Sequence, residues 1–287
     1  MIKPEIRELA DPSRRNWDAV GPRPVRAYLW EPAFPTLDPP PLVLLSHGTG
    51  GSAQDLAWLA EALTGAGFLV AGVDHHGNNW VDGYLPEGFA FDWERPRDLG
   101  FLLGELTRER RLGPVGAAGF SLGGYTAAAT VGARIDPERV RAVAEGLVPA
   151  PPLPEFPDLI EALRARIPQD QWEPLIQGSA ADVSVPQVLA AFLICPAVGE
   201  LIDESSLPRV TRPVAIRWGG ADDICPGPEN ALRYARHIPR AEAVCVGESV
   251  GHYVFVDGTE SGEPVRAAVA ADAVAFFRAE LGAPRPR

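Results

Sequence analysis

Lysine, cysteine and long apolar segments are scarce in this chain of 287 residues. It has a single lysine, Lys3, and three cysteines, Cys195, Cys225 and Cys245. Because the cysteines are scattered and show no CxxC or metal-ligand spacing, we expect reduced, buried thiols, no disulfide framework and no metal site. Without GxxxxGK[ST] or GxGxxG spacing, and with no lysine nearby, the glycine-rich segment of residues 46–51 is not a phosphate-binding cradle.

Charge and hydropathy exclude two further classes of protein. The formal net charge is −12 and the isoelectric point is near 4.9. Nucleic-acid binding needs clustered cations that release counterions, so we expect no nucleic-acid partner. The N-terminal segment lacks the apolar region of a secretory signal, and no uncharged apolar run is long enough to span a membrane. We therefore expect a cytoplasmic protein without stable membrane insertion, and the sequence leaves a homo-oligomer open.

Short apolar runs alternate with longer amphipathic stretches along the chain. This alternation is typical of βα units around a mostly parallel sheet. Strands are predicted at residues 41–46, 68–74, 115–120, 188–195, 214–218 and 241–246, and helices at 53–64, 97–108, 121–131 and 264–281. In the last helix, Val265, Val269 and Phe276 are predicted to face the sheet. The fold class is therefore α/β, with a core formed by residues 1–132 and 187–287.

Residues 133–186 interrupt this alternation. Asp136 and Pro137 form a helix start, with the aspartate as the cap and the proline at the first helical position. A proline-rich loop follows, and a second helix is predicted around residues 158–166. Because the segment has little strand pattern, we predict a small helical cap inserted between two strands of the sheet.

A candidate nucleophile lies directly after the strand at residues 115–120. Residues 119–123 read GFSLG, which matches G-x-S-x-G, and Ser121 is its central residue. A nucleophile on a sharp strand-to-helix turn crowds its neighbours, so glycines two residues before and two after let the backbone close. The motif by itself is only suggestive, because an ordinary strand-to-helix turn can use glycines in the same way. Such a turn would require no acid or base further along the chain.

An acid and a base follow in the order that this motif requires. His252 lies in a loop after the last predicted strand, whereas His237 falls at the end of a helical run and is expected to be a solvated imidazole. An imidazole can accept the serine proton and return it near neutral pH. Two adjacent carboxylates follow residues 214–218; we favour Asp222 as the acid and expect Asp223 to face outward or cap a helix. Asp203 is a weaker third candidate.

Residues 46–51, SHGTGG, follow the strand at 41–46 and supply a flexible backbone for binding a developing oxyanion. We predict the Thr49 and Leu122 amides as the two donors. His47, His75 and His76 lack the spacing of a metal site, so we expect one of the latter two to pack under the active-site loops.

Aromatic residues surround this segment in the sequence. Trp80, Tyr84, Phe91 and Tyr253 form either an apolar substrate pocket, with Trp80 and Tyr253 as contacts, or ordinary loop packing.

Several segments of the chain resemble the dienelactone-hydrolase-like branch of the α/β-hydrolases, which includes platelet-activating-factor acetylhydrolases. They are LLSHGTGGS at 44–52, AGVDHHGNN at 71–79, WERPRDL at 93–99, GFSLGGYTA at 119–127, CPAVG at 195–199 and GHYVF at 251–255. The resemblance implies the α/β-hydrolase fold, a triad of Ser121, Asp222 and His252, and oxyanion donors at Thr49 and Leu122. Dienelactone hydrolases proper carry a cysteine nucleophile where this chain has Ser121. Residues 133–186 resemble no segment of that family.

The sequence therefore predicts a serine hydrolase that cleaves small to medium carboxylic esters through an acyl-enzyme, with no cofactor. Two alternatives stay open at this stage. The same triad can transfer the acyl group to an alcohol or amine, or the fold can serve as a binding protein whose triad is idle.

Overall fold

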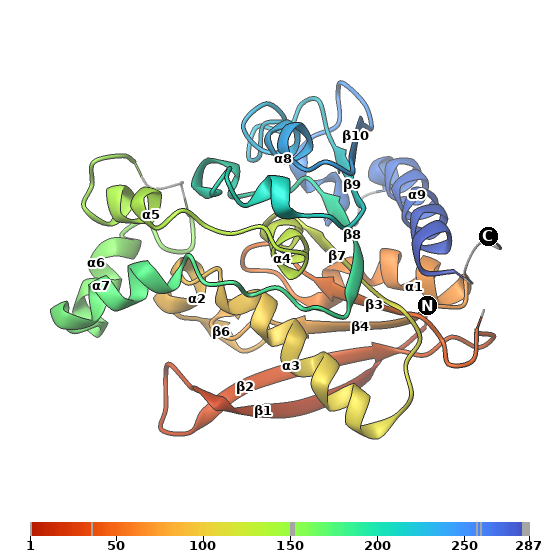
Figure 1. Cartoon of the computed structure of the whole chain (residues 1–287), viewed down its shortest axis with the longest axis horizontal. Helices are drawn as coiled ribbons and strands as arrows, with labels where there is room; N and C mark the ends of the chain where they lie inside the picture. The colour runs from red at the N-terminus through yellow and green to blue at the C-terminus, as the bar shows by residue number, and fades with distance from the viewer. Residues whose placement is uncertain (1, 36, 150–152, 257, 259, 283–287) are drawn as a thin grey trace.

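The computed structural model describes residues 2–35, 37–149, 153–256, 258 and 260–282, and its centre is an eight-stranded sheet (Figure 1). The strand order is β1-β2-β4-β3-β7-β8-β9-β10. The strands are β1 Glu5–Arg15, β2 Pro22–Trp30, β3 Leu42–Ser46, β4 Leu69–Asp74, β7 Val115–Phe120, β8 Val188–Ile194, β9 Val214–Trp218 and β10 Ala241–Cys245. A separate two-stranded ribbon pairs β5 Asn78–Asn79 with β6 Gly83–Tyr84.

Helices cover both faces of the sheet. They are α1 Ala57–Gly65, α2 Pro86–Ala90, α3 Glu94–Glu109, α4 Leu122–Thr130, α5 Pro137–Ala144, α6 Leu159–Arg166, α7 Gln169–Gly178, α8 Ala231–His237 and α9 Glu263–Leu281. Short 3-10 turns are η1 Ala53–Leu56, η2 Gly199–Leu201, η3 Leu207–Arg209, η4 His252–Phe255 and η5 Glu260–Gly262. Within the described ranges, no helix is both long and apolar enough to cross a membrane.

The six predicted strands form the parallel part of the sheet, β4-β3-β7-β8-β9-β10. The near-complete burial of β3, β4, β7 and β8 explains their continuous apolar runs, because a parallel sheet is covered on both faces, whereas the edge strand β10 has no fully buried residue. The sequence analysis did not predict β1 and β2, which extend the sheet antiparallel from β4. As an edge strand, β1 is exposed along most of its length and lacks an apolar run.

The core is divided between the two faces of the sheet. Helices α3, α4 and α8 contribute to the apolar cluster on one face, and α1 and α9 to that on the other. On α9, Val269 and Phe277 are completely buried, whereas Val265 and Phe276 are only half-buried. All three predicted residues pack against the apolar cluster on that face, and Phe276 contacts the Phe192 ring of β8 at 5.9 Å between centroids, while Phe277 is buried more deeply. A Cβ atom on Gly116 would lie 2.5 Å from the Phe277 ring, so α9 approaches β7 as closely as glycine allows.

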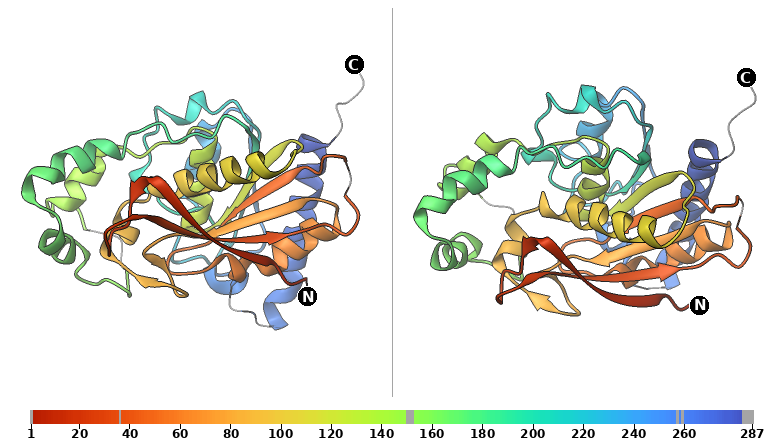
Figure 2. Two further views of the ribbon diagram at one scale, coloured as in Figure 1. Left: turned by 90° about the horizontal axis from the view of Figure 1, so that it is seen from below. Right: turned by 60° about the horizontal axis from the view of Figure 1, so that its bottom comes forward.

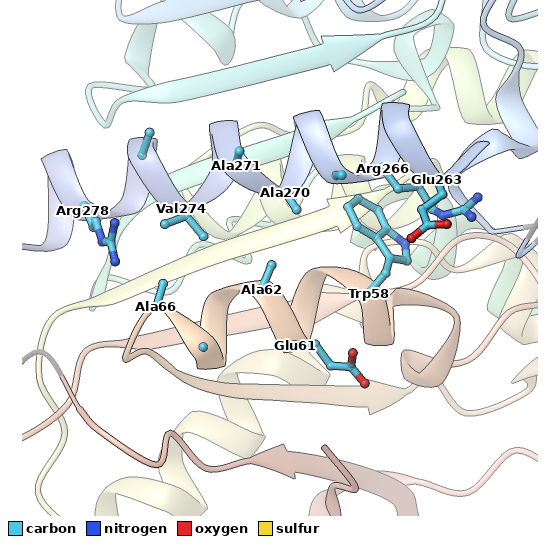
Figure 3. Close-up of a pocket in the computed structure, with 13 residues that line it drawn as sticks. Trp58, Glu61, Ala62, Ala66, Glu263, Arg266, Ala270, Ala271, Val274 and Arg278 are labelled. Carbon is cyan, nitrogen blue, oxygen red and sulfur yellow. The ribbon is translucent and has the colours of Figure 1, made fainter. Parts of the chain in front are cut away.

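Helices α1 and α9 lie side by side, and a groove of about 810 Å³ runs between them (Figure 3). Small side chains such as Ala62, Ala66 and Ala270 line it, with Glu61 and Arg278 at the rim. Neither Ser121 nor His252 lines this groove.

The segment of residues 133–186 contains α5, α6 and α7 and, in its described part, no strand of the main sheet. Helix α5 begins as predicted, because the Asp136 carboxylate accepts from the Glu138 N–H at 2.9 Å. The three helices lie together at one end of the molecule, away from α9 (Figures 1 and 2). A small apolar cluster of Phe89, Leu159 and Leu163 packs α6 onto α2. That this segment caps an active site stays a prediction.

Candidate active site

Ser121 occupies a strained turn between β7 and α4. Its backbone angles, φ of 54° and ψ of −120°, lie in a region that residues other than glycine rarely adopt. The flanking glycines are required by close backbone approach: a Cβ on Gly123 would lie 1.9 Å from the Ser46 carbonyl oxygen, and one on Gly119 would lie 2.1 Å from the Gly123 carbonyl oxygen. The spacing of the motif thus lets β7, α4 and the end of β3 meet at one point.

The His252 imidazole contacts this serine although the two residues are 131 positions apart. The distance from His252 Nε2 to Ser121 Oγ is 3.0 Å, and both side chains are buried. The imidazole packs against the Phe120 ring, with 4.7 Å between ring centroids. His237 lies elsewhere, at the end of α8, with its Nε2 3.9 Å from a Glu204 carboxylate oxygen.

Asp222 completes a chain of hydrogen bonds. Its Oδ2 lies 2.8 Å from His252 Nδ1, and its Oδ1 accepts from the Ile224 and Cys225 N–H groups at 3.1 and 2.7 Å. Burial by itself raises the pKa of Asp222, but these hydrogen bonds outweigh burial and lower the pKa below its usual range. An ionised Asp222 accepts a hydrogen bond from Nδ1–H, which keeps the ring proton on Nδ1 and leaves Nε2 free to accept the Ser121 hydroxyl proton.

The two other candidate acids lie away from the imidazole. Asp223 is exposed to solvent, and no helix of the described chain begins at its side chain. Asp203 sits in a different loop, where its Oδ1 accepts from the Ser205 N–H at 2.9 Å.

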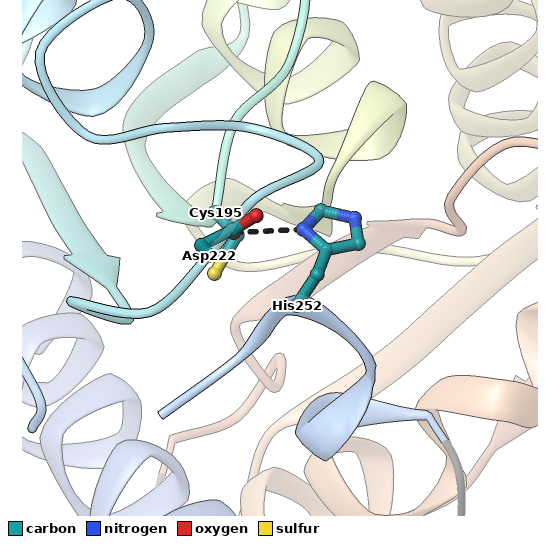
Figure 4. A group of neighbouring side chains, drawn as sticks. All are labelled: Cys195, Asp222 and His252. Carbon is teal, nitrogen blue, oxygen red and sulfur yellow. Dashed lines mark hydrogen bonds and ion pairs between the residues drawn. The ribbon is translucent and has the colours of Figure 1, made fainter. Parts of the chain in front are cut away.

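The thiol of Cys195 lies beside the acid, a contact that the sequence analysis did not foresee (Figure 4). Ligand atoms of Cys195, Asp222 and His252 all lie within 4.8 Å of one another. Burial raises the pKa of the Cys195 thiol well above its usual range, so the thiol stays protonated. Because metal ions bind the thiolate, this environment disfavours a metal ion at these three residues.

Hydrogen bonds from neighbouring side chains and backbone groups hold the loop of residues 47–51 in place. His47 Nδ1 lies 2.6 Å from the Gly48 carbonyl oxygen, and His47 Nε2 accepts from the His75 N–H at 3.1 Å. The Gly50 N–H donates to Asn78 Oδ1 at 2.6 Å, and its carbonyl accepts from the Tyr84 hydroxyl at 3.0 Å.

The two amides predicted to bind an oxyanion are not used in this network. Among hydrogen bonds between described residues, neither the Thr49 N–H nor the Leu122 N–H is a donor. Both groups are therefore free to donate to a ligand.

A second Ser-His-Asp arrangement lies beneath this loop. Ser46 Oγ is 2.9 Å from His75 Nε2, and His75 Nδ1 is 2.9 Å from Asp98 Oδ2, with all three side chains buried. Burial lowers the pKa of His75 to about 3, and Arg23 and Arg14 hold the pKa of Asp98 well below its usual range despite burial. These residues anchor the end of β3, and their complete burial leaves no access for a substrate.

The sequence analysis missed the role of Arg95 and Asp98, and α3 carries a signal that points to it. Arg95, Asp98, Leu99 and Leu102 are buried at helical spacing, so the two charged residues lie on the apolar face of the helix. Charged side chains in that position are buried only when they have partners, which makes them candidates for an internal network.

The predicted aromatic residues fall into two groups. Trp80 and Tyr253 are more than half exposed; Trp80 Nε1 donates to Asp55 at 3.4 Å, and Tyr253 packs edge-on against His252. Phe91 instead packs between Trp17 and Trp93, which is ordinary loop packing.

Glu155, from residues 133–186, reaches the same region as Tyr84. A Cβ built on Gly50 would lie 3.1 Å from its carboxylate and 3.3 Å from the Tyr84 hydroxyl. The inserted segment therefore borders the loop that carries Thr49.

Comparison with known proteins yields structural likeness only. No protein-family model matches the sequence, and no curated protein matches it. A ferulic acid esterase from Streptomyces cinnamoneus superposes with a TM-score of 0.60 at 20% identity, over 99% of this chain and 91% of that one. A cold-adapted esterase from an Arctic intertidal metagenomic library has a TM-score of 0.57 at 15% identity, over 97% and 94% of the two chains. A dienelactone hydrolase from Anabaena variabilis has a TM-score of 0.52 at 18% identity, over 97% and 99%.

These structures agree with the resemblance drawn from the sequence motifs. At such low identities the likeness establishes the arrangement of the chain rather than its activity. The mostly parallel sheet, the helices on both faces and the structural neighbours together confirm the predicted fold class. This protein has the α/β-hydrolase fold.

Proposed function

We propose that this protein is a serine hydrolase that cleaves carboxylic esters of small to medium size. The observation that carries the proposal is the buried hydrogen-bonded chain from Ser121 through His252 to Asp222, with distances of 3.0 and 2.8 Å. The esterases among the structural neighbours support the same reaction class. Carboxylic ester hydrolysis needs no cofactor in this scheme.

In the proposed reaction, Ser121 Oγ attacks the ester carbonyl carbon while its proton passes to His252 Nε2. The carbonyl oxygen becomes an oxyanion, to which the Thr49 and Leu122 N–H groups donate. Collapse of this intermediate breaks the bond to the alcohol oxygen, which takes the proton from His252. The product of this half-reaction is an acyl group on Ser121 and a free alcohol.

Water completes the cycle. His252 accepts a proton from the water as its oxygen attacks the acyl carbonyl carbon, and a second oxyanion forms. The bond to Ser121 Oγ then breaks, and the serine regains its proton from His252. Asp222 stays ionised throughout, holds the imidazole in one tautomer and stabilises its cationic form.

The proposed substrate contacts are the exposed aromatic residues and the inserted segment. Trp80 and Tyr253 are the proposed contacts for the apolar part of an ester, since aromatic faces provide apolar area. Residues 133–186 are the proposed determinant of substrate choice, because Glu155 borders Gly50.

The test compares hydrolysis of p-nitrophenyl esters of increasing acyl length by the wild type and by Ser121→Ala. We expect turnover of short acyl esters and a loss of at least about 10⁴-fold in the variant. A fluorophosphonate probe should label the wild type once per chain, at Ser121, and leave the variant unlabelled. Folded wild-type protein that neither hydrolyses any ester nor takes up the probe would contradict the proposal and favour an idle binding fold.

A further inference from the structure

We propose that Arg95 is a positioning residue that sets the spacing between the two oxyanion donors. Arg95 lies in the first turn of α3 and is 1% exposed. Its Nη2 donates a short hydrogen bond to the His47 carbonyl, and its Nε donates to Thr126 Oγ1 at 3.2 Å. One guanidinium thus connects the loop of Thr49 to helix α4, which begins at Leu122.

The contact on the loop side fixes the orientation of a peptide. In a trans peptide the C=O and N–H groups point in opposite directions, and the only cis peptide of the described chain is Asp38–Pro39. Holding the His47 carbonyl toward Arg95 therefore points the Gly48 N–H in the opposite direction. The next carbonyl, that of Gly48, is held by His47 Nδ1 and by the Gly51 N–H at 3.3 Å. With two successive carbonyls held, the direction of the Thr49 N–H is fixed.

The contact on the helix side reaches the second donor. The Thr126 hydroxyl, which accepts from Arg95, donates to the Leu122 carbonyl at 3.0 Å. Arg95 therefore restrains the first turn of α4, where the Leu122 N–H makes no hydrogen bond to another described residue. Preorganised donors stabilise a developing oxyanion because they need no rearrangement at the moment of reaction.

The charge of Arg95 argues against a role in folding stability alone. Burial lowers its pKa to about 10, so it is still protonated at neutral pH. No carboxylate of the described chain forms an ion pair with it, and its Nη1 has no hydrogen-bond partner there. The attraction of the Asp92 and Asp98 carboxylates offsets only part of the cost of burying this cation, since its pKa stays lowered, so stability alone does not account for Arg95.

The test compares Arg95→Met, Arg95→Lys and Thr126→Val with Arg217→Lys as the matched control. Arg217 is also a buried arginine, but its side chain pairs with Asp272 on α9 and with Glu242 on β10 rather than with the loop of Thr49 or with α4. Each variant is titrated with a fluorophosphonate, so that rates refer to active protein. The kinetic arm rests on the proposed esterase function. For Arg95→Met we expect kcat to fall about 100-fold with KM within about 3-fold, and the affinity for an aryl boronic acid, which forms a tetrahedral adduct, to fall in parallel.

Arg95→Lys should recover part of kcat, because one ammonium group can donate to the His47 carbonyl. Arg217→Lys should match the wild type. If Arg95→Met does not fold, Thr126→Val tests the same connection, because it removes the hydroxyl between Arg95 and the Leu122 carbonyl. We expect its kcat to fall about 10-fold. An unchanged kcat in folded Arg95→Met, or an equal loss in Arg217→Lys, would overturn the proposal.

Hydrogen–deuterium exchange separates this proposal from the proposed function. Deuterium uptake over residues 47–51 should rise in Arg95→Met, or in Thr126→Val where that variant alone folds, and stay unchanged in Arg217→Lys. This comparison is decisive even if the wild type hydrolyses no ester, because it measures the order of the loop directly. Equal deuterium uptake in all variants would refute the positioning role of Arg95. A wild type without activity or labelling would refute only the proposed esterase function.

Discussion

Replacing the two adjacent aspartates one at a time gives the sharpest test of the catalytic arrangement. In Asp222→Asn, the amide oxygen can still accept from the Ile224 and Cys225 N–H groups, which the carboxylate holds at 3.1 and 2.7 Å. The amide nitrogen then faces His252 Nδ1 at the position where Oδ2 now lies, 2.8 Å away. Because an amide nitrogen donates, Nδ1 must accept, and the ring proton moves to Nε2.

A proton on Nε2 removes the acceptor for the Ser121 hydroxyl. We therefore expect kcat to fall about 10⁴-fold, as for the equivalent change in a serine protease, which corresponds to about 5.5 kcal/mol of lost transition-state stabilisation. KM should change little, since Asp222 is not expected to touch the substrate. The assay is initial-rate hydrolysis of p-nitrophenyl acetate, with active sites counted by a fluorophosphonate.

Asp223→Asn is the matched control, with the same loss of charge one residue away. Because Asp223 is exposed, its substitution should change kcat by no more than about 2-fold. Equal losses in both variants, or full activity in Asp222→Asn, would refute the assignment of the acid.

Acid unfolding gives a second readout of the same carboxylate. The folded pKa of Asp222 is lowered, so its contribution to stability is present above the unfolded pKa near 4 and is lost as pH falls through the folded value. The stability difference between the wild type and Asp222→Asn should therefore shrink below about pH 4, as measured by urea unfolding.

Three further substitutions test the packing and electrostatics around the site. Gly123→Ala should lower the free energy of unfolding in urea by about 1–3 kcal/mol and slow fluorophosphonate labelling, because its Cβ meets the Ser46 carbonyl. Gly104→Ala is the control: the space around Gly104 on α3 is open, so this change should raise the free energy of unfolding by up to about 1 kcal/mol. Burial raises the pKa of Asp92 to about 7, so the stability of the wild type relative to Asp92→Asn should fall by up to about 4 kcal/mol as pH rises from 4 to 7; a stability difference that does not change with pH would contradict it. Phe277→Ala should lower the free energy of unfolding by about 3–5 kcal/mol, while Phe34→Ala, at a side chain 87% exposed, should leave it unchanged.

Much of the architecture followed from local sequence patterns. The six parallel strands were predicted from short apolar runs, which are visible in a short window of the sequence; in β3, β4, β7 and β8 these runs are buried on both faces. The turn at Ser121 was equally local, since the glycines at 119 and 123 are needed within one strand-to-helix connection. The start of α5 followed from Asp136 and Pro137, whose preferences act over a single turn.

Other features depend on contacts between distant parts of the chain. Strand β1 has almost no apolar pattern, and its place beside β2 comes from pairing at the edge of the sheet. The burial of Phe277 rather than Phe276 against Gly116 depends on how α9 rotates over β7. Neither choice leaves a mark in a short window of sequence.

The sequence by itself determined where the six parallel strands lie along the chain, the turn that presents Ser121 and the residue types for an acid and a base. Only the tertiary structure decided that Asp222, rather than its neighbour, faces His252, and that Arg95 joins the loop of Thr49 to helix α4. The physical reason is the distance along the chain over which each interaction acts. Backbone propensities and apolar periodicity act within a few residues, whereas a hydrogen bond between side chains 131 positions apart exists only after the sheet has brought the ends of its strands together.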